Sequence, residues 1–309
     1  MTTIRLAFKR LRARPLLTAL LVVGLSLMVA LPTAIPAYSD AAISRVLSQQ
    51  DFQDTGSRPP FAYLYVYSSA IRGPIGSEDV AEVDAFLVED GLPSLGLPQA
   101  TQSSFFDTIR YGAFWGTDDQ AVLRLATMSD LTDRVRITEG ALPGPPTGGE
   151  PFDVIVHASR SEDLAVGVGD VIGLSDLEID PDGPREGTAL RIVGFWEASD
   201  EDDPYWIFDP SELENRLFTD RATITAELAP ERPDLLATAA WYTVLDAESL
   251  SAGDVDGILA RSNEVTRTAL TMLPGLVLQV DPNEGFVEFQ ERSESLRRRL
   301  NAFALPAIG

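Results

Sequence analysis

The sequence of 309 residues contains no cysteine, one histidine and one lysine. The lack of cysteine excludes disulfides, thiolate metal sites and cysteine nucleophiles. The single histidine, His157, excludes a histidine-rich metal site, and the chain has no G-x-S-x-G motif that would make it part of a catalytic triad. The only lysine, Lys9, lies in no G-x-x-x-x-G-K-[ST] motif, so the chain has no P-loop. We therefore expect no enzymatic activity, no bound cofactor and no metal.

Charge is unevenly distributed along the chain. There are 24 basic and 47 acidic residues, and five of the basic ones precede Asp40, the first acidic residue. The remainder then has 19 basic against 47 acidic residues, a formal charge of −28. Such an acidic body repels phosphate backbones, so we expect no nucleic-acid partner.

A long uncharged run follows the basic start. Residues 16–35 are rich in Leu, Val and Ala and carry no charge. Twenty helical residues span about 30 Å, which is the thickness of a bilayer's hydrocarbon core. The preceding cations place the N-terminus in the cytoplasm and the residues after the uncharged run outside the cell membrane. We predict an amphipathic cytoplasmic helix over 1–15 and a transmembrane helix over 16–37, with membrane lipids as partners.

A cleaved signal peptide is the alternative for this segment. It would share the basic start, and residues 39–41 form a small-x-small cleavage site. The apolar run is longer than the usual core of about 7–15 residues, which favours a retained anchor. The residues before the run also have helical apolar spacing, at Ile4, Ala7, Phe8 and Leu11.

The rest of the chain has the pattern of an α+β fold. We predict an α/β sandwich outside the cell, with a small β-rich subdomain, a barrel or a sandwich, inserted where the Pro/Gly-rich stretch 140–149 begins. Alternation and β-branched content predict strands, and apolar periodicity predicts a helix from an N-cap at Ser77 to Glu89 and another over 246–261. The predicted strands are 61–67, 121–128, 152–157, 171–174, 189–195 and 241–245. The predicted bounds are 38–60 for a stalk helix and linker, 61–139 and 238–283 for the α/β subdomain, and 140–237 for the inserted subdomain.

The C-terminal residues predict a second stalk helix over 284–309. Its apolar residues recur at helical spacing, and the residues after Arg299 carry no charge. We expect this uncharged end to be the start of a second transmembrane segment, with a frayed terminal tail as the alternative. The apolar stripe consists of Phe286, Phe289, Leu296, Leu300 and Phe303.

One acidic run with two aromatic neighbours is the candidate contact site. The run lacks the EF-hand spacing, which favours a solvated loop over a calcium site. Tyr205 and Trp206 follow it as candidate contacts for a partner or a lipid headgroup, and the alternative is that they fill the seam between the subdomains. The acidic residues are Asp200, Glu201, Asp202 and Asp203.

Two segments carry a resemblance to a known family. The first is IRLAFKRLRARPLLTALLVVGLSLMVA. The second is EGALPGPPTGGEPFDVIVHASRSEDLAVGVGDVIGLS with the later LRIVGFWEASDEDDPYW, and it contains Gly140-x-Leu142-Pro143 and a Val168-Gly169-Asp170 turn. Both are similar to permease subunits of ATP-driven (ABC) transporters of the MacB/FtsX type, the first to their amphipathic helix and first transmembrane helix, the second to their extracytoplasmic domain.

This resemblance implies a porter-like extracytoplasmic domain between two transmembrane helices. It implies a separate cytoplasmic ABC ATPase and a second permease copy or homologue as partners. ATP hydrolysis by that partner would move the outer domain, for export or for release of a lipoprotein, peptide or drug. The sequence departs from the family in having only one complete predicted span. Two other readings stay open, a single-pass anchored binding or adhesion protein and a secreted hydrolase.

Overall fold

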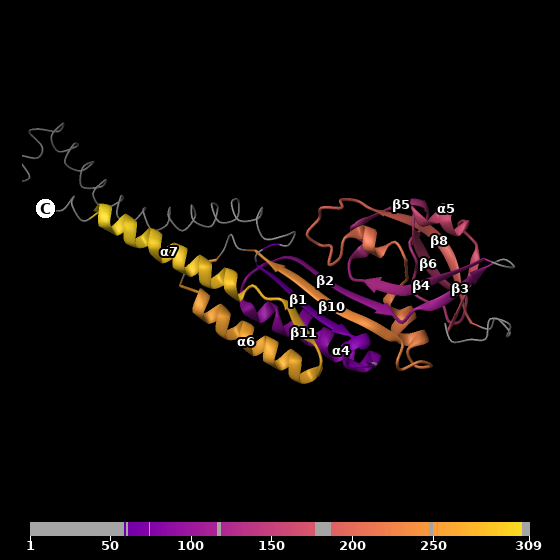
Figure 1. Cartoon of the computed structure of the whole chain (residues 1–309), viewed down its shortest axis with the longest axis horizontal. Coiled ribbons are helices and arrows are strands. Elements are labelled where there is room, and N and C mark those ends of the chain that lie inside the picture. Colours follow the sequence, from indigo (N-terminus) through magenta and orange to yellow (C-terminus); the bar gives the residue numbers. More distant parts are fainter. Residues whose placement is uncertain are drawn as a thin grey trace, which may run out of the picture.

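A computed structural model gives the fold of residues 59, 61–73, 75–115, 119–176, 187–246, 250–251 and 253–304. These residues form an elongated mixed α/β structure, with long helices toward one end and a β-rich lobe at the other (Figure 1). The α+β prediction is thus confirmed at the level of a mixed α/β fold. The predicted segments 1–15 and 16–37, and 38–58 of the first stalk, lie outside the described residues. Within the described residues, no helix is both long and apolar enough to cross a bilayer.

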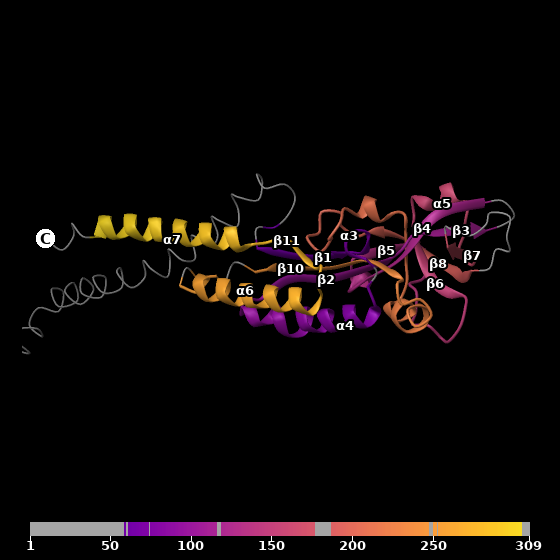
Figure 2. The same ribbon diagram turned by 60° about the horizontal axis from the view of Figure 1, so that its bottom comes forward.

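The first lobe is an antiparallel sheet in the order β11-β1-β10-β2, with helices on one face (Figure 2). Side chains of β1 alternate between the two faces, so Tyr63 and Tyr65 point toward the helices while Leu64 points away. The strands are β1 (Ala62–Ser68), β2 (Gln99–Thr108), β10 (Leu236–Leu245) and β11 (Val277–Val280). The helices are α3 (Ser69–Arg72), α4 (Ser77–Ala85), the π-helical η1 (Phe86–Gly91), the short η2 (Pro93–Leu95) and α6 (Val255–Met272).

The second lobe is a small β-barrel. Strands pair in the order β4-β3-β7-β8-β6-β9, and β9 pairs back with β4, which closes the ring, while β5 extends it by pairing with β8. Helix α5 (Arg160–Leu164) follows β6, and three short helical turns complete the lobe: η3 (Leu131–Asp133), η4 (Pro210–Leu213) and η5 (Thr223–Leu228). The strands are β3 (Tyr111–Trp115), β4 (Asp119–Met128), β5 (Val135–Gly140), β6 (Phe152–His157), β7 (Val171–Asp176), β8 (Thr188–Ala198) and β9 (Arg216–Phe218).

The predicted strands match observed ones in position, and two helix predictions need correction. The helix predicted over 246–261 begins only at Val255, because Ser251 and Asp254 close a turn through a 2.6 Å side-chain hydrogen bond. Ser77 is the first residue of α4 and makes no capping bond; Gly76 is the N-cap. β3 and β5, which the predicted bounds place in the α/β subdomain, pair with barrel strands. The domain bounds themselves stay a prediction.

Helix α7 (Asn283–Ala304) leaves the first lobe and points away from the barrel (Figure 1). Near its start, Phe286 and Phe289 are buried in the core beneath the sheet. These two residues belong to the five-residue apolar stripe from which the helix was predicted. Its role as a stalk toward a membrane stays a prediction.

Candidate functional site

The strand β2 is shared by the two lobes. It pairs with β10 of the first lobe and with β4 of the barrel. Successive residues of β2 point to opposite faces of the strand here. Phe105 lies in a second core and Asp107 shares its face. Phe106 lies on the other face, in the larger core under the helices. An arginine from the barrel contacts each face.

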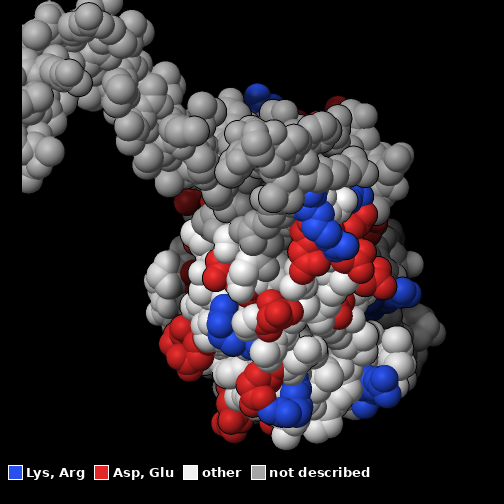
Figure 3. Space-filling model, turned by 90° about the vertical axis from the view of Figure 1, so that its left-hand side faces the viewer, with Lys and Arg blue, Asp and Glu red and all other residues white. Residues whose placement is uncertain are grey.

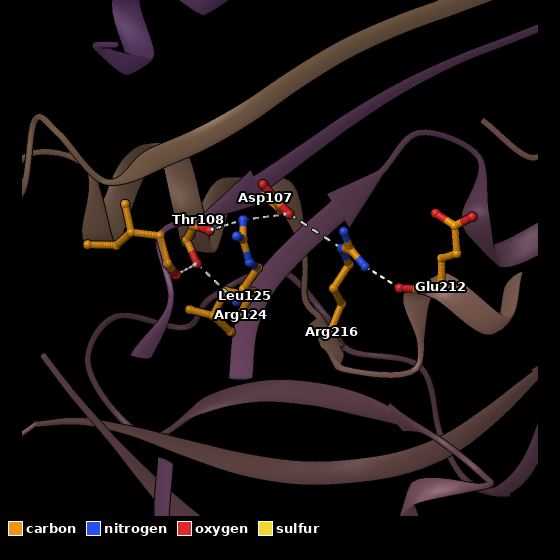
Figure 4. A network of polar contacts seen from close by, with 7 residues as sticks. Asp107, Thr108, Arg124, Leu125, Glu212 and Arg216 are labelled. Carbon is orange, nitrogen blue, oxygen red and sulfur yellow. Dashed lines mark hydrogen bonds and ion pairs between the residues drawn. The ribbon is translucent and has the colours of Figure 1, made fainter. Parts of the chain in front are cut away.

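On the face of β2 that carries Phe105, Asp107 is a buried carboxylate between two arginines (Figure 4). Its Oδ2 accepts hydrogen bonds from Arg124 Nη1 of β4 at 3.1 Å and from Arg216 Nε of β9 at 3.4 Å. The Arg216 guanidinium also donates to the backbone carbonyl of Glu212 and lies 5.5 Å from the ring centre of Phe105. The carboxylate therefore joins β2 to two barrel strands that are neighbours only in space.

Thr108 supports the same junction through its backbone and its hydroxyl. Its carbonyl accepts from Arg124 Nη1 at 3.2 Å, and its Oγ1 accepts from the backbone N–H of Leu125 at 3.0 Å while donating to the carbonyl of Ile109. These bonds connect Thr108, the last residue of β2, to Arg124 and Leu125 of β4. The end of β2 is thus fixed to β4 by side chains as well as by strand pairing.

Burial raises the pKa of Asp107 above its ordinary value. The charges of Arg124 and Arg216 and the Thr238 hydroxyl act in the opposite direction and offset this only in part. The other carboxylate oxygen, Oδ1, is buried and has no hydrogen-bond donor among the described residues. Loss of water around this oxygen is the physical reason that the charged form is disfavoured.

On the face of β2 that carries Phe106, Arg221 links the barrel to the helical layer. Its Nη2 donates to Asp84 Oδ2 of α4 at 2.8 Å, and its guanidinium carbon lies 4.6 Å from the ring centre of Phe106. The second oxygen of Asp84 accepts from Trp241 Nε1 of β10, also at 2.8 Å. One carboxylate thereby joins a helix, a first-lobe strand and the segment that follows β9.

We call these four residues, Arg216 with Asp107 and Arg221 with Asp84, the arginine clamp. Both arginines come from one short stretch, β9 and the residues after it, and they contact β2 on its two faces. Charge-assisted hydrogen bonds with partly buried guanidinium groups fix geometry more strongly than exposed pairs do. The arrangement can hold the lobes in one orientation. Sequence analysis did not identify any of the four.

The predicted contact residues Tyr205 and Trp206 lie in the second core. Their exposed fractions are 1% and 9%, and Trp206 stacks near Trp196. Tyr205 donates to the carbonyl of Ser129, Trp206 Nε1 donates to the carbonyl of Asp200, and burial raises the pKa of Tyr205. This position agrees with the packing alternative. Partner or lipid contact stays a prediction that requires the two rings to leave the core.

The acidic run before these aromatics folds as a bonded loop. Asp203 pairs with Arg134 at 2.7 Å and accepts from the backbone N–H of Tyr205 at 2.9 Å, and Asp200 Oδ1 accepts from the N–H of Asp202 at 3.1 Å. Among the described residues, no group of three or more His, Cys, Asp or Glu side chains could hold a metal ion. The loop positions Tyr205 and Trp206.

His157 packs at the end of β6. Its Nδ1 lies 2.7 Å from Ser159 Oγ, and its ring meets Trp196 edge-on at 4.7 Å between centres. Partial burial lowers the pKa of His157, while Glu214, Glu197 and Glu201 act to raise it. These contacts hold the imidazole ring in place at the end of β6.

The acidic excess is not gathered into one patch on the end of the molecule from which α7 extends. There, acidic and basic side chains are intermingled with uncharged surface (Figure 3).

Two solved structures are similar in shape to this chain. The periplasmic region of MacB from Actinobacillus actinomycetemcomitans aligns at 8% identity and a TM-score of 0.43, covering 82% of this chain and 98% of that one. The extracellular domain of the noncanonic ABC-type transporter YknZ from Gram-positive bacteria aligns at 10% identity and a TM-score of 0.37, covering 68% and 93%. Such values mark a loose likeness and assign no activity. No protein-family model and no curated protein sequence match the chain.

Proposed function

We propose that this chain supplies the extracytoplasmic domain of a permease subunit in an ATP-driven transporter of the MacB/FtsX type. The apolar segment 16–37 anchors it in the cell membrane, and a separate cytoplasmic ABC ATPase provides the energy. The chain itself catalyses no reaction. Its task is to transmit movement from the membrane to the barrel lobe, for export or for release of a lipoprotein, peptide or drug. The sequence resemblance and the geometry of α7 support this proposal.

The attachment of α7 is the observation that carries the proposal. The helix has 22 residues and is therefore about 33 Å long. The ring of Phe286, near its start, lies 5.0 Å from that of Phe61, directly before β1. The chain thus enters and leaves the described domain at one place on the sheet. A displacement of the membrane-side segments would reach the first lobe at this place.

The arginine clamp supports transmission beyond the first lobe. A movement of the sheet would reach the barrel through β2, which both lobes share, and the clamp holds β2 on each face. A domain joined in this way moves as a rigid body when its attachment is displaced. The five basic residues that precede the uncharged run 16–35 support the proposed topology.

The test uses the absence of cysteine, which allows spin labels at chosen positions in the native membrane complex. Labels at Arg298→Cys on α7 and Leu270→Cys on α6, both exposed positions, would report the angle between the helices. We expect their distance to change between nucleotide-free and ATP-vanadate states. As a control for topology, Val171→Cys in the barrel should be labelled by an impermeant maleimide only from outside the cell. If this control succeeds and the distance between the two spin labels is unchanged, the anchored binding protein is favoured instead.

A further inference from the structure

The first turns of α6 and the residues after η2 enclose a pocket on the surface of the first lobe. These turns lie on the side of the lobe from which α7 extends (Figure 1). The pocket has a volume of about 430 Å³, which is within the range of sites for small ligands. Three of its lining residues are glycines, Gly96, Gly253 and Gly257, and two are charged, Asp254 and Arg261.

Arg261 presents its guanidinium group to this pocket. Its Nε and Nη2 donate to the carbonyl of Leu95 at 3.2 Å and 2.8 Å, which fixes the plane of the group. A Cβ added at Gly257 would lie 3.3 Å from Nη1 of Arg261, so a side chain there would crowd this nitrogen. Glycine is less favourable than alanine in a helix. The close approach of the guanidinium group accounts for the glycine at this position.

Asp254 places the opposite charge in the same pocket. It precedes Arg261 by seven residues, which is about two helical turns, so both lie on one side of α6. The arginine side chain reaches back to Gly257, about 4.5 Å along the helix axis from Asp254. Asp254 accepts a 2.6 Å hydrogen bond from Ser251 Oγ. Within the part of the chain that the structure describes, neither Asp254 nor Arg261 belongs to an ion pair.

A cation and an anion that line one pocket without pairing fit a ligand that carries both charges. We propose that the pocket binds a phosphorylated amine, with its phosphate on Arg261 and its ammonium group on Asp254. Phosphoethanolamine has this chemistry, and its two-carbon spacer fits the separation of the two side chains. Its source is a free metabolite or the headgroup of an ethanolamine phospholipid, since both carry the same two charges. The inference does not depend on ATP-driven transport.

Calorimetric titration of the full-length protein tests the ligand. The protein is placed in nanodiscs of phosphatidylglycerol, so that no ethanolamine headgroup competes. The probes are phosphoethanolamine, inorganic phosphate and ethanolamine, of which the last two each lack one of the charges. We expect phosphoethanolamine to bind at least tenfold more tightly than either. Equal affinities for phosphoethanolamine and phosphate, or no binding of any probe at millimolar concentration, would overturn the proposal.

Three variants test the site within the pocket. Asp254→Asn keeps an oxygen for Ser251 and should abolish the preference for phosphoethanolamine over phosphate. Gly257→Leu fills the pocket at an exposed position with a good helix former. It should lower the affinity at least tenfold without lowering the thermal midpoint. The control Arg267→Gln changes an exposed arginine of the same helix and should leave the affinity unchanged. Wild-type affinity in Gly257→Leu would place the ligand elsewhere and contradict the proposal.

Nanodiscs of phosphatidylethanolamine then identify the source of the ligand. If the lipid headgroup enters the pocket, the apparent affinity for added phosphoethanolamine should fall at least fivefold relative to phosphatidylglycerol nanodiscs. An unchanged affinity would assign the pocket to the free metabolite. Both results agree with the proposed chemistry of the pocket. Binding of phosphoethanolamine together with an unchanged distance between the spin labels on α6 and α7 would remove the transport proposal and leave this site.

Discussion

Arg221 donates a 2.8 Å hydrogen bond to Asp84, a residue 137 positions earlier in the chain. The bond ties the segment after β9 to helix α4, on the face of β2 that carries Phe106. On the other face, Arg216 of the same segment binds Asp107. Two ion pairs on opposite faces of one strand resist rotation about that strand in both directions, which a single pair would not do.

The raised pKa of Asp107 predicts a particular pH dependence. The native state holds the proton of this carboxyl more tightly than the unfolded chain does. The stabilising contribution of the protonated carboxyl to the free energy of unfolding is therefore fully present below the ordinary pKa of 3.8. It is lost as the pH rises through the native pKa. In urea titrations, the wild type should therefore lose stability relative to Asp107→Asn as the pH rises above 3.8. If the wild type instead gains stability relative to Asp107→Asn as the pH rises, the charges of the two arginines affect the pKa of Asp107 more than burial does.

Arg221→Met should destabilise the fold through its ion pair and its ring contact. We expect the free energy of unfolding to fall by about 1.5 kcal/mol, because both interactions are partly shielded from water. Arg267→Met is the control, since Arg267 and its partner Glu264 are 71% and 62% exposed. That change should cost less than about 0.5 kcal/mol. Equal losses in the two variants would show that the Arg221 contacts contribute nothing specific.

Trp206→Ala tests the position of the aromatic pair. A tryptophan that is 9% exposed leaves a cavity when truncated, and the expected loss of unfolding free energy is about 3 kcal/mol. The control, Val171→Ala at a 52% exposed site, should change it by no more than about 0.5 kcal/mol. A Trp206 variant of wild-type stability that fails to bind membranes or partners would support the contact prediction instead.

Position 140 requires glycine for two reasons: its φ angle is positive, and the backbone of β8 lies too close to leave room for a Cβ atom. It has φ +80°, and an added Cβ would collide with the carbonyl oxygen of Val193 in β8. Gly148 has φ +88°, yet nothing lies within 4 Å of its Cβ position. Gly140→Ala should therefore cost about 3 kcal/mol, whereas Gly148→Ala should cost about 1 kcal/mol from the left-handed conformation alone. Equal thermal midpoints for the two variants would contradict the close contact.

Sequence patterns located the strands whose side chains alternate or are strongly apolar. β6 was predicted at its observed bounds, 152–157, because all but two of its residues are apolar. β2 was missed because its first half reads as polar. The structure buries Ser103 and Ser104 there, the first through a hydrogen bond to the Tyr205 carbonyl and the second through the backbone and hydroxyl of Ser129. Such partners are distant in sequence, so local polarity gave no signal of burial.

The arginine clamp was missed for a related reason. Asp107 and Arg216 are 109 positions apart, and their contact depends on the parallel pairing of β9 with β4. Closure of the barrel brings them together, and periodicity in one segment contains no information about closure. The only local sequence pattern that points to this site is an acidic residue directly after two phenylalanines, at positions 105–107. That pattern indicates a buried carboxylate only once the strand is known to be covered on both faces.

The distance between the two lobes tests the central claim most directly. Spin labels at Ile71→Cys in α3 and Val171→Cys in β7, both exposed positions, report it by pulsed electron resonance. We predict one narrow distance distribution with the clamp intact, and a distinctly broader one when Asp107→Asn and Arg221→Met are combined. A broad distribution with the clamp intact, or an equally narrow one without it, would contradict the account of two lobes held as one body.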